Sequence, residues 1–539
     1  GLTEGIFQFD APFVKQTLRK MHPTSFLEIS ALNALNRPGP IAFIPQFIAR
    51  MHGEETIEYV HPKAEPILKE TYGIIVYQEQ VMQLTRALAG FTRGQSDNVR
   101  KAMGKKLIEM LNELEGKFYE GCEKEQTLDR ATAKDLWEKF KEFAKYAFNK
   151  SHAIAYSIVA NQCAYLKANY TPEFLAASMS SNLNDTDQLA LFVDDAKSNF
   201  GIQIVAPDIN ESESLFTVRD GKIVYGLAAL KGVGTVATDA IVAERNANGK
   251  FKNLTDFAKR CAPIMNKRIL EAFAKTGVLD SLEPNRAAIY MNADMILSYA
   301  AKSRDGANML SLFANTVEDD VDEDRLHKNL PKTAPWTFGQ RLENELSALG
   351  FYISAHPLDQ YKHLIKSANL TTSATLAKLG DRKAVQIAVN VNSFSRRRTK
   401  TGKEMITINA SDSFGNIDAV AFGDLAIEFS QILSGDTVVL LSGKTSNRDD
   451  RVSVFVDSIT PLTHWVAKIA KKITMDIRDK AVLQDVKKAI VALPRGYTQV
   501  VLNLHGADKV ATLALPGGVE LGDTTIADLT ALGLKIEVE

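Results

Sequence analysis

Cysteine is scarce in this sequence of 539 residues, and the three that occur, Cys122, Cys163 and Cys261, are far apart. None of them has the spacing of metal ligands, which excludes zinc-finger sites and a disulfide framework. Free thiols in a reducing cytoplasm are the simplest interpretation. Long hydrophobic runs are also lacking, and no signal peptide opens the chain. We therefore expect no membrane span and no membrane partner.

Net charge is almost absent, because 64 basic residues oppose 65 acidic ones and the formal charge is −1. Nucleic-acid binding therefore has to rest on local patches and not on bulk charge. The chain also lacks a Walker loop, a nucleophile elbow and an HExxH motif. It has no isolated acidic pair flanked by strands that would hold two magnesium ions. The residues alone indicate binding surfaces and no reaction centre.

Hydrophobic periodicity divides the chain into a helical part and a strand-rich part. Residues 1–205 have mostly helical spacing, and from 206 to about 298 short helices alternate with glycine-containing turns. Apolar periodicity disappears over 303–335, where the acidic run Asp319–Asp324 predicts a solvated linker. From residue 383 the period changes to two, which is typical of strands.

The strand-rich part is predicted to form a small barrel followed by a small α/β unit. Barrel strands are expected at 385–391, 405–410, 417–422, 437–442 and 452–459, and five strands so close together favour an OB-fold. After Pro461, we expect a helix at 478–492, strands at 500–506 and 509–515, and a short helix near 525–532. The fold class is therefore multidomain: mainly α-helical, then a β-barrel, then α/β.

The stretch YAFNKSHAIAYS, residues 146–157, places polar residues between two segments of helical spacing. Asn149 or Ser151 is expected to cap the second helix, because its side-chain oxygen accepts from amides of the first turn. A cap does not explain Lys150, since a cation at the positive end of a helix dipole is unfavourable without an anion. The stretch is either a phosphate-binding site or an ordinary cap with a solvated lysine.

A basic cluster occupies RGQSDNVRKAMGKK, residues 93–106, where Asp97 is the single acid. Its cations are Arg93, Arg100, Lys101, Lys105 and Lys106. On a helix, Lys101 and Lys105 are neighbours and repel each other by roughly 0.2–0.5 kcal/mol. The cluster is either a solvated helix face or a row of phosphate contacts, each adding about 0.9 to the salt dependence of binding.

A glycine-rich turn follows an apolar segment in GLAALKGVGTVATDAIVAERNANGKF, residues 226–251. This pattern is typical of a helix-hairpin-helix, in which Gly232 and Gly234 let backbone amides face a phosphate. Such contacts position nucleic acid without reading its bases. A degenerate second copy is expected at 268–282, and the alternative is a plain glycine-rich connection between helices.

The stretch SRRRTKTGKE, residues 395–404, is predicted to join the first two barrel strands, with Phe394 beside it. In an OB-fold this connection borders the groove for single strands, where cations follow the backbone and aromatic rings stack on bases. The alternative is a solvated hairpin tip.

Taken together, these stretches resemble the bacterial DNA polymerase III alpha subunit of the DnaE type. The matching motifs, in family order, are TEGIFQFD, ALNRPGP, TYGIIVYQEQVM, VRKAMGKK, YAFNKSHAIAYS, APDIN, VYGLAALKGVGTVA and LGFYISAHPLDQY. A barrel after the fingers fits this type and not the PolC type. In the family, a PHP domain and a palm with metal-binding aspartates precede the matched region. The resemblance therefore implies a C-terminal fragment that starts after the palm.

The resemblance also implies a domain order. It consists of fingers (1–205), a tandem helix-hairpin-helix region for duplex DNA (206–298), a clamp-binding segment with an acidic linker (299–335), a connector (336–382), an OB-fold (383–462) and a τ-binding-like α/β domain (463–539).

Site residues follow from the motifs and the resemblance together. Nucleotide and DNA contacts in the fingers are expected from Arg37, Arg100, Lys101, Lys105, Lys106, Asn149, Lys150, Ser151 and His152; duplex contacts from Lys231, Gly232, Val233 and Gly234; and single-strand contacts from Phe394, Arg396, Arg397, Arg398, Lys400 and Lys403. The clamp-binding motif of the family corresponds to Met309, Leu310, Ser311, Leu312 and Phe313, where Met309 replaces the usual glutamine. Catalytic and metal-binding residues are expected only in the palm, with Mg²⁺ as its cofactor.

Two functions are consistent with these features. The first is part of a replicative DNA-directed DNA polymerase in the cytoplasm, whose partners are primer–template and single-stranded DNA, dNTP, the β sliding clamp and the τ subunit. The fragment alone is then expected to be inactive. The second is a non-enzymatic module for DNA binding and scaffolding. An error-prone paralogue is disfavoured by the C-terminal α/β unit and the clamp-like segment.

Overall fold

The computed structural model describes the whole chain apart from residues 105–106, 145–147, 311–325, 327–329, 377, 400–401, 436, 449–450, 479–481, 507–508, 523–524, 527–528, 530–531 and 533. Within that part of the chain, no helix is both long and apolar enough to cross a membrane. The chain forms two compact units, Gly1–Phe174 and Leu175–Glu539. The predicted fold class, with helical domains, then a barrel, then a small α/β domain, is confirmed.

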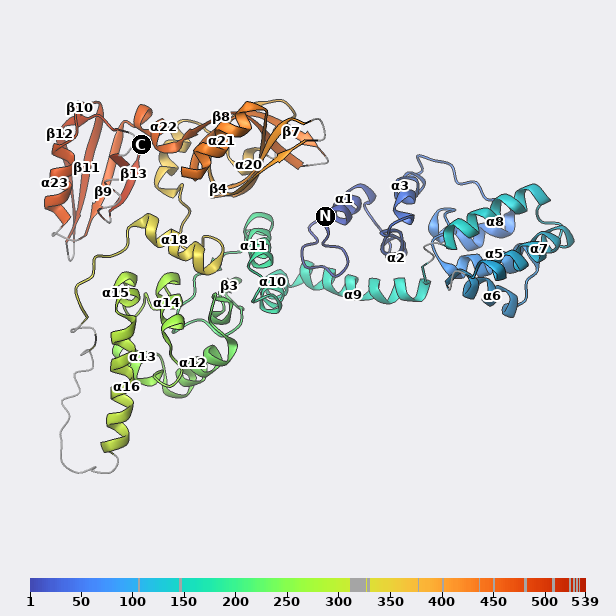
Figure 1. The fold of residues 1–539 in the computed structure, drawn as a ribbon, viewed down its shortest axis with the longest axis horizontal. Helices are drawn as coiled ribbons and strands as arrows, with labels where there is room; N and C mark the ends of the chain where they lie inside the picture. The colour runs from blue at the N-terminus through green and yellow to red at the C-terminus, as the bar shows by residue number, and fades with distance from the viewer. Residues whose placement is uncertain are drawn as a thin grey trace. The chain divides into compact units, whose positions relative to one another are not determined.

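The first unit is helical (Figure 1). Its α-helices are α1 (Pro12–Met21), α2 (Phe26–Leu35), α3 (Ile44–Met51), α4 (Glu65–Leu68), α5 (Gln78–Ala89), α6 (Arg93–Gly104), α7 (Ile108–Lys124), α8 (Arg130–Ala144) and α9 (Lys150–Asn169). Pro12 and Pro45 lie in the first turns of α1 and α3, where a missing amide hydrogen costs nothing.

Two hydrophobic clusters hold this unit together. Helices α5 to α8 pack around Phe118 and Trp137, which are fully buried and have ring centroids 5.0 Å apart. Helices α1, α2, α3 and α9 form the other cluster, where Ala153 and Ala160 of α9 are buried with Phe47. Small residues on α9 let its backbone approach α2 closely.

The second unit begins with short helices. They are α11 (Thr186–Asp194), α12 (Thr235–Asn248), α13 (Leu254–Arg260), α14 (Lys267–Thr276), α15 (Arg286–Met291), α16 (Ala293–Leu310), α18 (Phe338–Leu349), α19 (Lys362–Ser367) and α20 (Ser373–Leu376), and α10 (Thr171–Ser181) spans the division between the units. The strands β1 (Ile204–Val205), β2 (Thr217–Arg219) and β3 (Lys222–Val224) form a small sheet. The helix α16 continues to Leu310, further than the loss of periodicity after 303 predicts, and Leu326 of the predicted solvated linker is buried.

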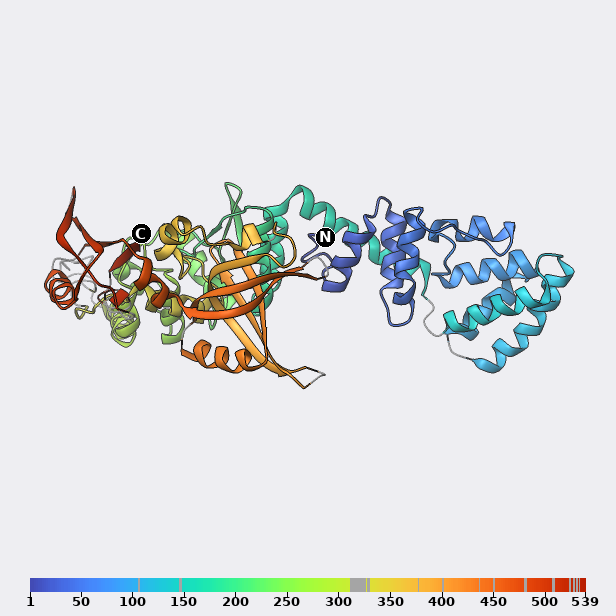
Figure 2. The same ribbon diagram turned by 90° about the horizontal axis from the view of Figure 1, so that it is seen from above.

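A closed five-stranded barrel follows, in the order β4-β5-β6-β8-β7. Its elements are β4 (Ala384–Arg398), β5 (Glu404–Asp412), β6 (Gly415–Phe422), α21 (Asp424–Gly435), β7 (Val438–Arg448) and β8 (Arg451–Pro461). Neighbouring strands are antiparallel except for the parallel pair β6 and β8, which closes the barrel. This topology, with Ile387, Val439 and Val454 fully buried inside, confirms the predicted OB-fold. The β4–β5 hairpin extends past the body of the barrel (Figure 2).

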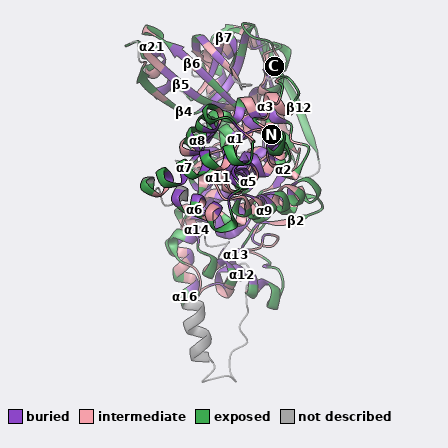
Figure 3. Ribbon diagram, turned by 90° about the vertical axis from the view of Figure 1, so that its right-hand side faces the viewer, coloured by how far each residue is buried: buried purple, intermediate pink, exposed green. Residues whose placement is uncertain are grey.

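The C-terminal part is a five-stranded sheet with the helices α22 and α23 among its described residues. Its elements are α22 (Leu462–Ile469), β9 (Lys472–Ile477), α23 (Leu483–Val491), β10 (Arg495–Gly496), β11 (Thr498–His505), β12 (Val510–Val519) and β13 (Lys535–Val538), in the sheet order β10-β12-β11-β9-β13. Strand β12 is exposed over most of its length (Figure 3). The core of this sheet is shared: Ile473 and Met475 are buried in one cluster with Leu358 and Tyr361 of the connector and Leu440 of the barrel.

Candidate nucleic-acid interface

The start of α9 has the predicted cap but an unpredicted anion. The side chain of Asn149 accepts a hydrogen bond from the His152 amide at 3.0 Å, so Asn149 and not Ser151 is the cap. The Lys150 ammonium lies 2.6 and 2.7 Å from the two carboxylate oxygens of Glu70. A carboxylate of the same chain therefore neutralises the cation for which the sequence predicts a phosphate partner.

A second carboxylate lies at the same helix start. Glu79 accepts from the Lys150 amide at 2.8 Å and from the Asn149 side chain at 2.9 Å, where the positive end of the helix dipole favours an anion. The ring of Tyr77 lies below, with its centroid 5.7 Å from the Lys150 ammonium. Burial, and then the charges of Glu70 and Glu79, raise the pKa of the Tyr77 hydroxyl, which is therefore neutral.

Aromatic rings bring Arg37 and His152 to this cluster. The Arg37 guanidinium lies 4.1 Å from the ring centroid of Phe148, and its buried Nε has no hydrogen-bond partner in the described structure. The His152 ring lies against Tyr156, with ring centroids 4.1 Å apart and planes tilted by 35°, and it meets Phe148 edge-on. The predicted residues Arg37, Asn149, Lys150, Ser151 and His152 thus lie around one helix start.

The basic cluster on α6 is partly neutralised. Asp97 binds both Arg100, at 2.8 Å, and Lys101, at 2.9 Å. These hydrogen bonds, from Lys101 first and then Arg100, lower the pKa of the Asp97 carboxyl. The three side chains are partly exposed, so the pairs contribute little to stability and can exchange for phosphate. Lys105 and Lys106 lie outside the described residues.

The predicted hairpin is a tight turn between a 3₁₀ turn at Leu227–Ala229 and α12. Gly232 has φ +87°, a conformation that L side chains rarely adopt, whereas Gly234 has φ −99° and open space around it. Lys231 is exposed and Val233 is buried, so the turn is anchored by one side chain while the other is free to contact a ligand. The start of α12 has no side-chain cap.

The predicted second copy, 268–282, is α14 and the turn that leads to α15. Its Gly277 also has positive φ, at +77°, but the Arg286 guanidinium covers it. Arg286 binds Asp280 through both Nε and a terminal nitrogen at 2.7–3.1 Å. The second turn is thus covered by an arginine of its own repeat that already binds a carboxylate.

The barrel arginines are in a strand and not in a loop, which corrects the expectation that 395–404 joins two strands. Strand β4 continues to Arg398 and β5 begins at Glu404, because the ladder extends beyond the barrel. Arg396 and Arg398 lie on one face and pair with Glu404 at 3.2 and 2.7 Å. Arg397 lies on the opposite face, because side chains alternate along a strand.

Phe394 and Lys403 are exposed on this hairpin, and Lys400 lies outside the described residues. The predicted cations therefore divide between the two faces of the β4–β5 ribbon. Only Arg397 of the three arginines lacks an ion pair in the described structure.

The sequence did not predict two aromatic residues of the barrel, Phe422 and Phe455, as candidate contacts. Phe422 of β6 is 41% exposed, and its ring centroid is 5.9 Å from that of Phe455 on β8. The register places Met405 opposite Phe422, with Arg397 opposite Met405, so the rings continue the outer face on which Arg397 lies. Strand alternation could have suggested Phe422, but it does not say which face of a strand is outside the barrel.

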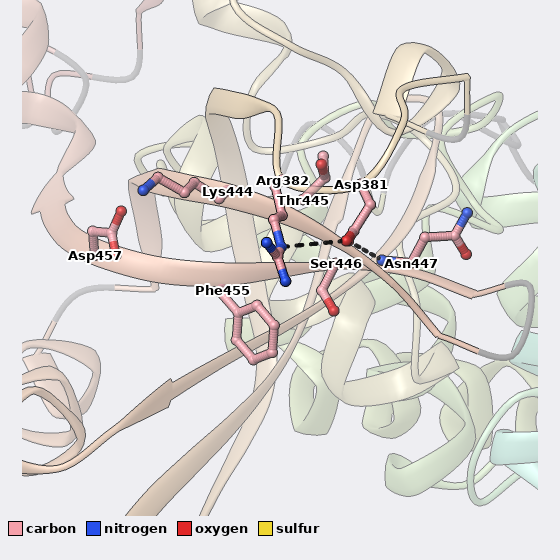
Figure 4. Close-up of a pocket in the computed structure, with 8 residues that line it drawn as sticks. All are labelled: Asp381, Arg382, Lys444, Thr445, Ser446, Asn447, Phe455 and Asp457. Carbon is pink, nitrogen blue, oxygen red and sulfur yellow. Dashed lines mark hydrogen bonds and ion pairs between the residues drawn. The ribbon is translucent and has the colours of Figure 1, made fainter.

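A pocket of about 380 Å³ adjoins this aromatic pair (Figure 4). It is lined by Asp381, Arg382, Lys444, Thr445, Ser446, Asn447, Phe455 and Asp457. Arg382 and Lys444 bring cations, and Phe455 brings the edge of the aromatic pair. Asp381 accepts a hydrogen bond from the Asn447 amide at 3.0 Å, which holds the connector against β7. Asp381 and Asp457 also line the pocket, so its two cations are balanced by two carboxylates, and Arg382 lies 3.7 Å from Asp381.

The predicted clamp-binding segment falls mostly outside the description. Met309 and Leu310 are the last residues of α16, and Ser311, Leu312 and Phe313 lie outside the described residues. Among the described side chains, no group of three or more His, Cys, Asp and Glu residues is arranged to hold a metal ion.

Comparison with known protein families finds three matches. Residues 1–126 match the finger domain of the bacterial DNA polymerase III alpha subunit, residues 201–289 match a helix-hairpin-helix motif, and residues 385–462 match an OB-fold nucleic acid binding domain. The matches fall on the helical first unit, on the turn at Gly232 and on the barrel. The predicted helix-hairpin-helix is thereby confirmed.

Curated proteins named DNA polymerase III subunit alpha are similar along most of the chain. The protein from Borreliella burgdorferi is 36% identical over 85% of this chain and 40% of its own length. The one from Caulobacter vibrioides is 35% identical over 96% of this chain and 45% of its own length, and the one from Aquifex aeolicus is 33% identical over 99% and 45%. The chain spans about two fifths of the length of these relatives.

Proposed function

Because this chain belongs to the family of bacterial DNA polymerase III alpha subunits, we propose that it supplies the DNA-binding and nucleotide-binding surfaces of a replicative DNA polymerase. One observation carries the proposal: a polymerase finger domain, a helix-hairpin-helix and an OB-fold nucleic acid binding domain follow one another in a single chain. The alternative, a scaffold without polymerase activity, needs the same surfaces.

The start of α9 is the proposed binding site for the incoming nucleotide. Lys150, Arg37 and His152 gather there, and the pair between Lys150 and Glu70 is half-exposed, with side chains 30% and 26% accessible. A triphosphate has more charge and more acceptor oxygens than a carboxylate, so it can replace Glu70 on the ammonium. Arg100 and Lys101 can exchange Asp97 for phosphate in the same way.

The first hairpin, at Lys231–Gly234, is the proposed duplex contact. Its exposed lysine, its positive-φ glycine and the uncapped start of α12 suit a phosphate group approached by backbone amides. Contacts of this kind hold duplex DNA in register for any sequence.

The outer face of the barrel is the proposed path of single-stranded template. Arg397 and Lys403 border it, and the rings of Phe422 and Phe455 offer a surface on which bases stack. The pocket beside Phe455 is sized for one nucleotide of such a strand.

Partners beyond DNA are proposed from the sequence. The segment 309–313 suits a sliding clamp, because two leucines and a phenylalanine next to an acidic run form a short apolar anchor. The C-terminal sheet is proposed to bind the τ subunit, in the cytoplasm. Mg²⁺ is proposed to act in a palm supplied by the rest of the polymerase, and no step of this chain depends on it.

Two measurements test the proposal on the chain of 539 residues. Fluorescence anisotropy should give binding of primer–template, duplex and single-stranded DNA, with affinity falling as salt rises. A chain that binds none of the three overturns the proposal. Primer extension with Mg²⁺ and dNTPs separates the two candidate functions: the polymerase proposal expects activity from the full-length protein and none from this chain. A full-length protein without activity favours the scaffold.

A further inference from the structure

A guanidinium group from the second hairpin repeat lies against the phosphate-binding turn of the first. Arg268 is in the first turn of α14, and a Cβ built on Gly232 would lie 3.1 Å from its Cζ and nearer still to its Nε. The side chain therefore rests on the bare backbone of the turn, in the space that any other residue at position 232 would fill. Lacking a Cβ, Gly232 permits this contact as well as its own φ of +87°.

Arg268 makes no ion pair with any carboxylate in the described part of the chain, and its side chain is exposed. Its neighbour Lys267 is different, because its ammonium binds Asp294 at 2.7 Å. Arg286, the counterpart over Gly277 in the second turn, binds Asp280. Arg268 is thus a cation over a turn glycine without the internal anion that Arg286 has.

The turn at Gly232 also offers backbone hydrogen-bond donors beside the Arg268 guanidinium. The amides of Gly232 and Gly234 donate no hydrogen bond to any described group, whereas the Lys231 and Val233 amides bind the carbonyls of Ala348 and Leu230. Two free amides and a planar guanidinium with several donors match the tetrahedral oxygens of one phosphate.

We propose that Arg268 is a DNA phosphate ligand that the second repeat supplies to the first hairpin, so that both repeats hold one phosphate together. This inference rests on the proposed duplex binding. It explains why the arginine over Gly232 has no internal anion while the arginine over Gly277 binds Asp280: the first turn receives its anion from DNA and the second from its own repeat. The first hairpin then depends on α14 for affinity, and its phosphate contact fixes the angle between DNA and the second repeat.

The test compares Arg268→Ala with Lys267→Ala, two substitutions that remove the same charge from adjacent positions. Affinity of the 539-residue chain for duplex DNA should fall about tenfold for Arg268→Ala, with the salt slope lower by about 0.9, and less than about twofold for Lys267→Ala. Thermal melting should be unchanged, because the Arg268 side chain is exposed. Equal losses from the two variants overturn the inference and leave duplex binding intact.

Duplexes with a single neutral methylphosphonate identify the phosphate. At one position of the scan, the wild-type chain should lose about tenfold in affinity and Arg268→Ala should lose nothing further, because the contact is already gone. Lys267→Ala should behave as wild type there. If each methylphosphonate position lowers the affinity of Arg268→Ala by the same factor as it lowers that of the wild type, Arg268 contacts no phosphate. A wild-type chain that binds no duplex at all contradicts the proposed function itself.

Discussion

The ammonium of Lys150 and the carboxylate of Glu70 form a bidentate ion pair, with both N–O distances at 2.6–2.7 Å, across 80 residues of sequence. The pair occupies the helix start at which we propose that a nucleotide binds. Glu70 is therefore a competitor of the incoming phosphate as well as a partner of Lys150.

Replacing Glu70 by glutamine should strengthen nucleotide binding in the full-length protein. The expected gain is about two- to fivefold, because a partly exposed ion pair contributes up to about 1 kcal/mol. Lys150→Ala should instead cost about 1.5–3 kcal/mol of nucleotide binding, measured as kcat/KM for dNTP. An unchanged kcat/KM in Lys150→Ala would remove Lys150 from the nucleotide site. Melting curves of both variants report whether the fold persists.

Substitution of the two hairpin glycines by valine should have different effects on stability. Gly232→Val should lower the free energy of unfolding by about 1–2 kcal/mol or more, because φ is +87° and Arg268 fills the space. Gly234→Val meets neither obstacle, so its melting temperature should stay near wild type while duplex affinity falls. Both losses of affinity should be the same for different DNA sequences. A sequence-dependent loss would mean that the turn reads bases.

Removing Arg397 from the barrel should weaken single-strand binding more than removing Arg398. Arg397, on the outer face, has no ion pair among the described residues, and Arg398 already binds Glu404, whose carboxyl pKa it lowers. Phe422→Ala and Phe455→Ala should each cost about 1–3 kcal/mol, the value of one stacked base. Titrations with single-stranded and duplex DNA check this. Equal losses for both DNA forms would contradict a single-strand path on this face.

The first unit should lose stability at alkaline pH through Tyr72. Burial, and then its hydrogen bond to Glu28 at 2.7 Å, raise the pKa of Tyr72 to about 12. A raised pKa stabilises the fold below the unfolded value of about 10, and the contribution is lost as pH rises toward 12. Burial raises the pKa of Glu28, but hydrogen bonds from Tyr72, Thr24 and Ser25 outweigh it and lower the value overall, so its contribution is lost in acid.

Tyr72→Phe should reduce unfolding free energy by about 1–2 kcal/mol near neutral pH and flatten the alkaline loss. Tyr156→Phe, on α9 of the same unit, provides a matched control, because no hydrogen bond of its hydroxyl is among the described contacts. Melting temperatures between pH 7 and 12 measure both effects. An unchanged alkaline slope in Tyr72→Phe would assign the loss to other groups.

Leu312→Ala together with Phe313→Ala should abolish binding to the sliding clamp while DNA binding and melting stay unchanged. Two apolar side chains carry most of the energy of so short an anchor. Surface plasmon resonance on immobilised clamp measures the loss. If the double variant unfolds, the segment is part of the core. If it binds the clamp normally, the segment does not contribute to clamp binding.

Local signals predicted more of this molecule than long-range contacts did. The cap at Asn149 and the turn at Gly232 depend on a few neighbouring residues, and the barrel strands depend on a period of two within each segment; all are found. The Glu70 partner of Lys150 lies 80 residues away, and no local pattern encodes it. Residues 396–398 are three consecutive arginines, so they lack the alternation of apolar and polar residues by which a strand is predicted, although they lie in β4.

The core shared by the connector, the barrel and the C-terminal sheet has a practical consequence for dissecting the protein. Truncating the chain after the last barrel strand, at Pro461, would expose Leu358, Tyr361 and Leu440 to solvent. They would then form an apolar patch that promotes aggregation. A truncated chain that aggregates would then be misread as a chain that has lost the binding site of a partner. Point substitutions on exposed faces, such as Leu513 of β12, separate the two outcomes, and truncation does not.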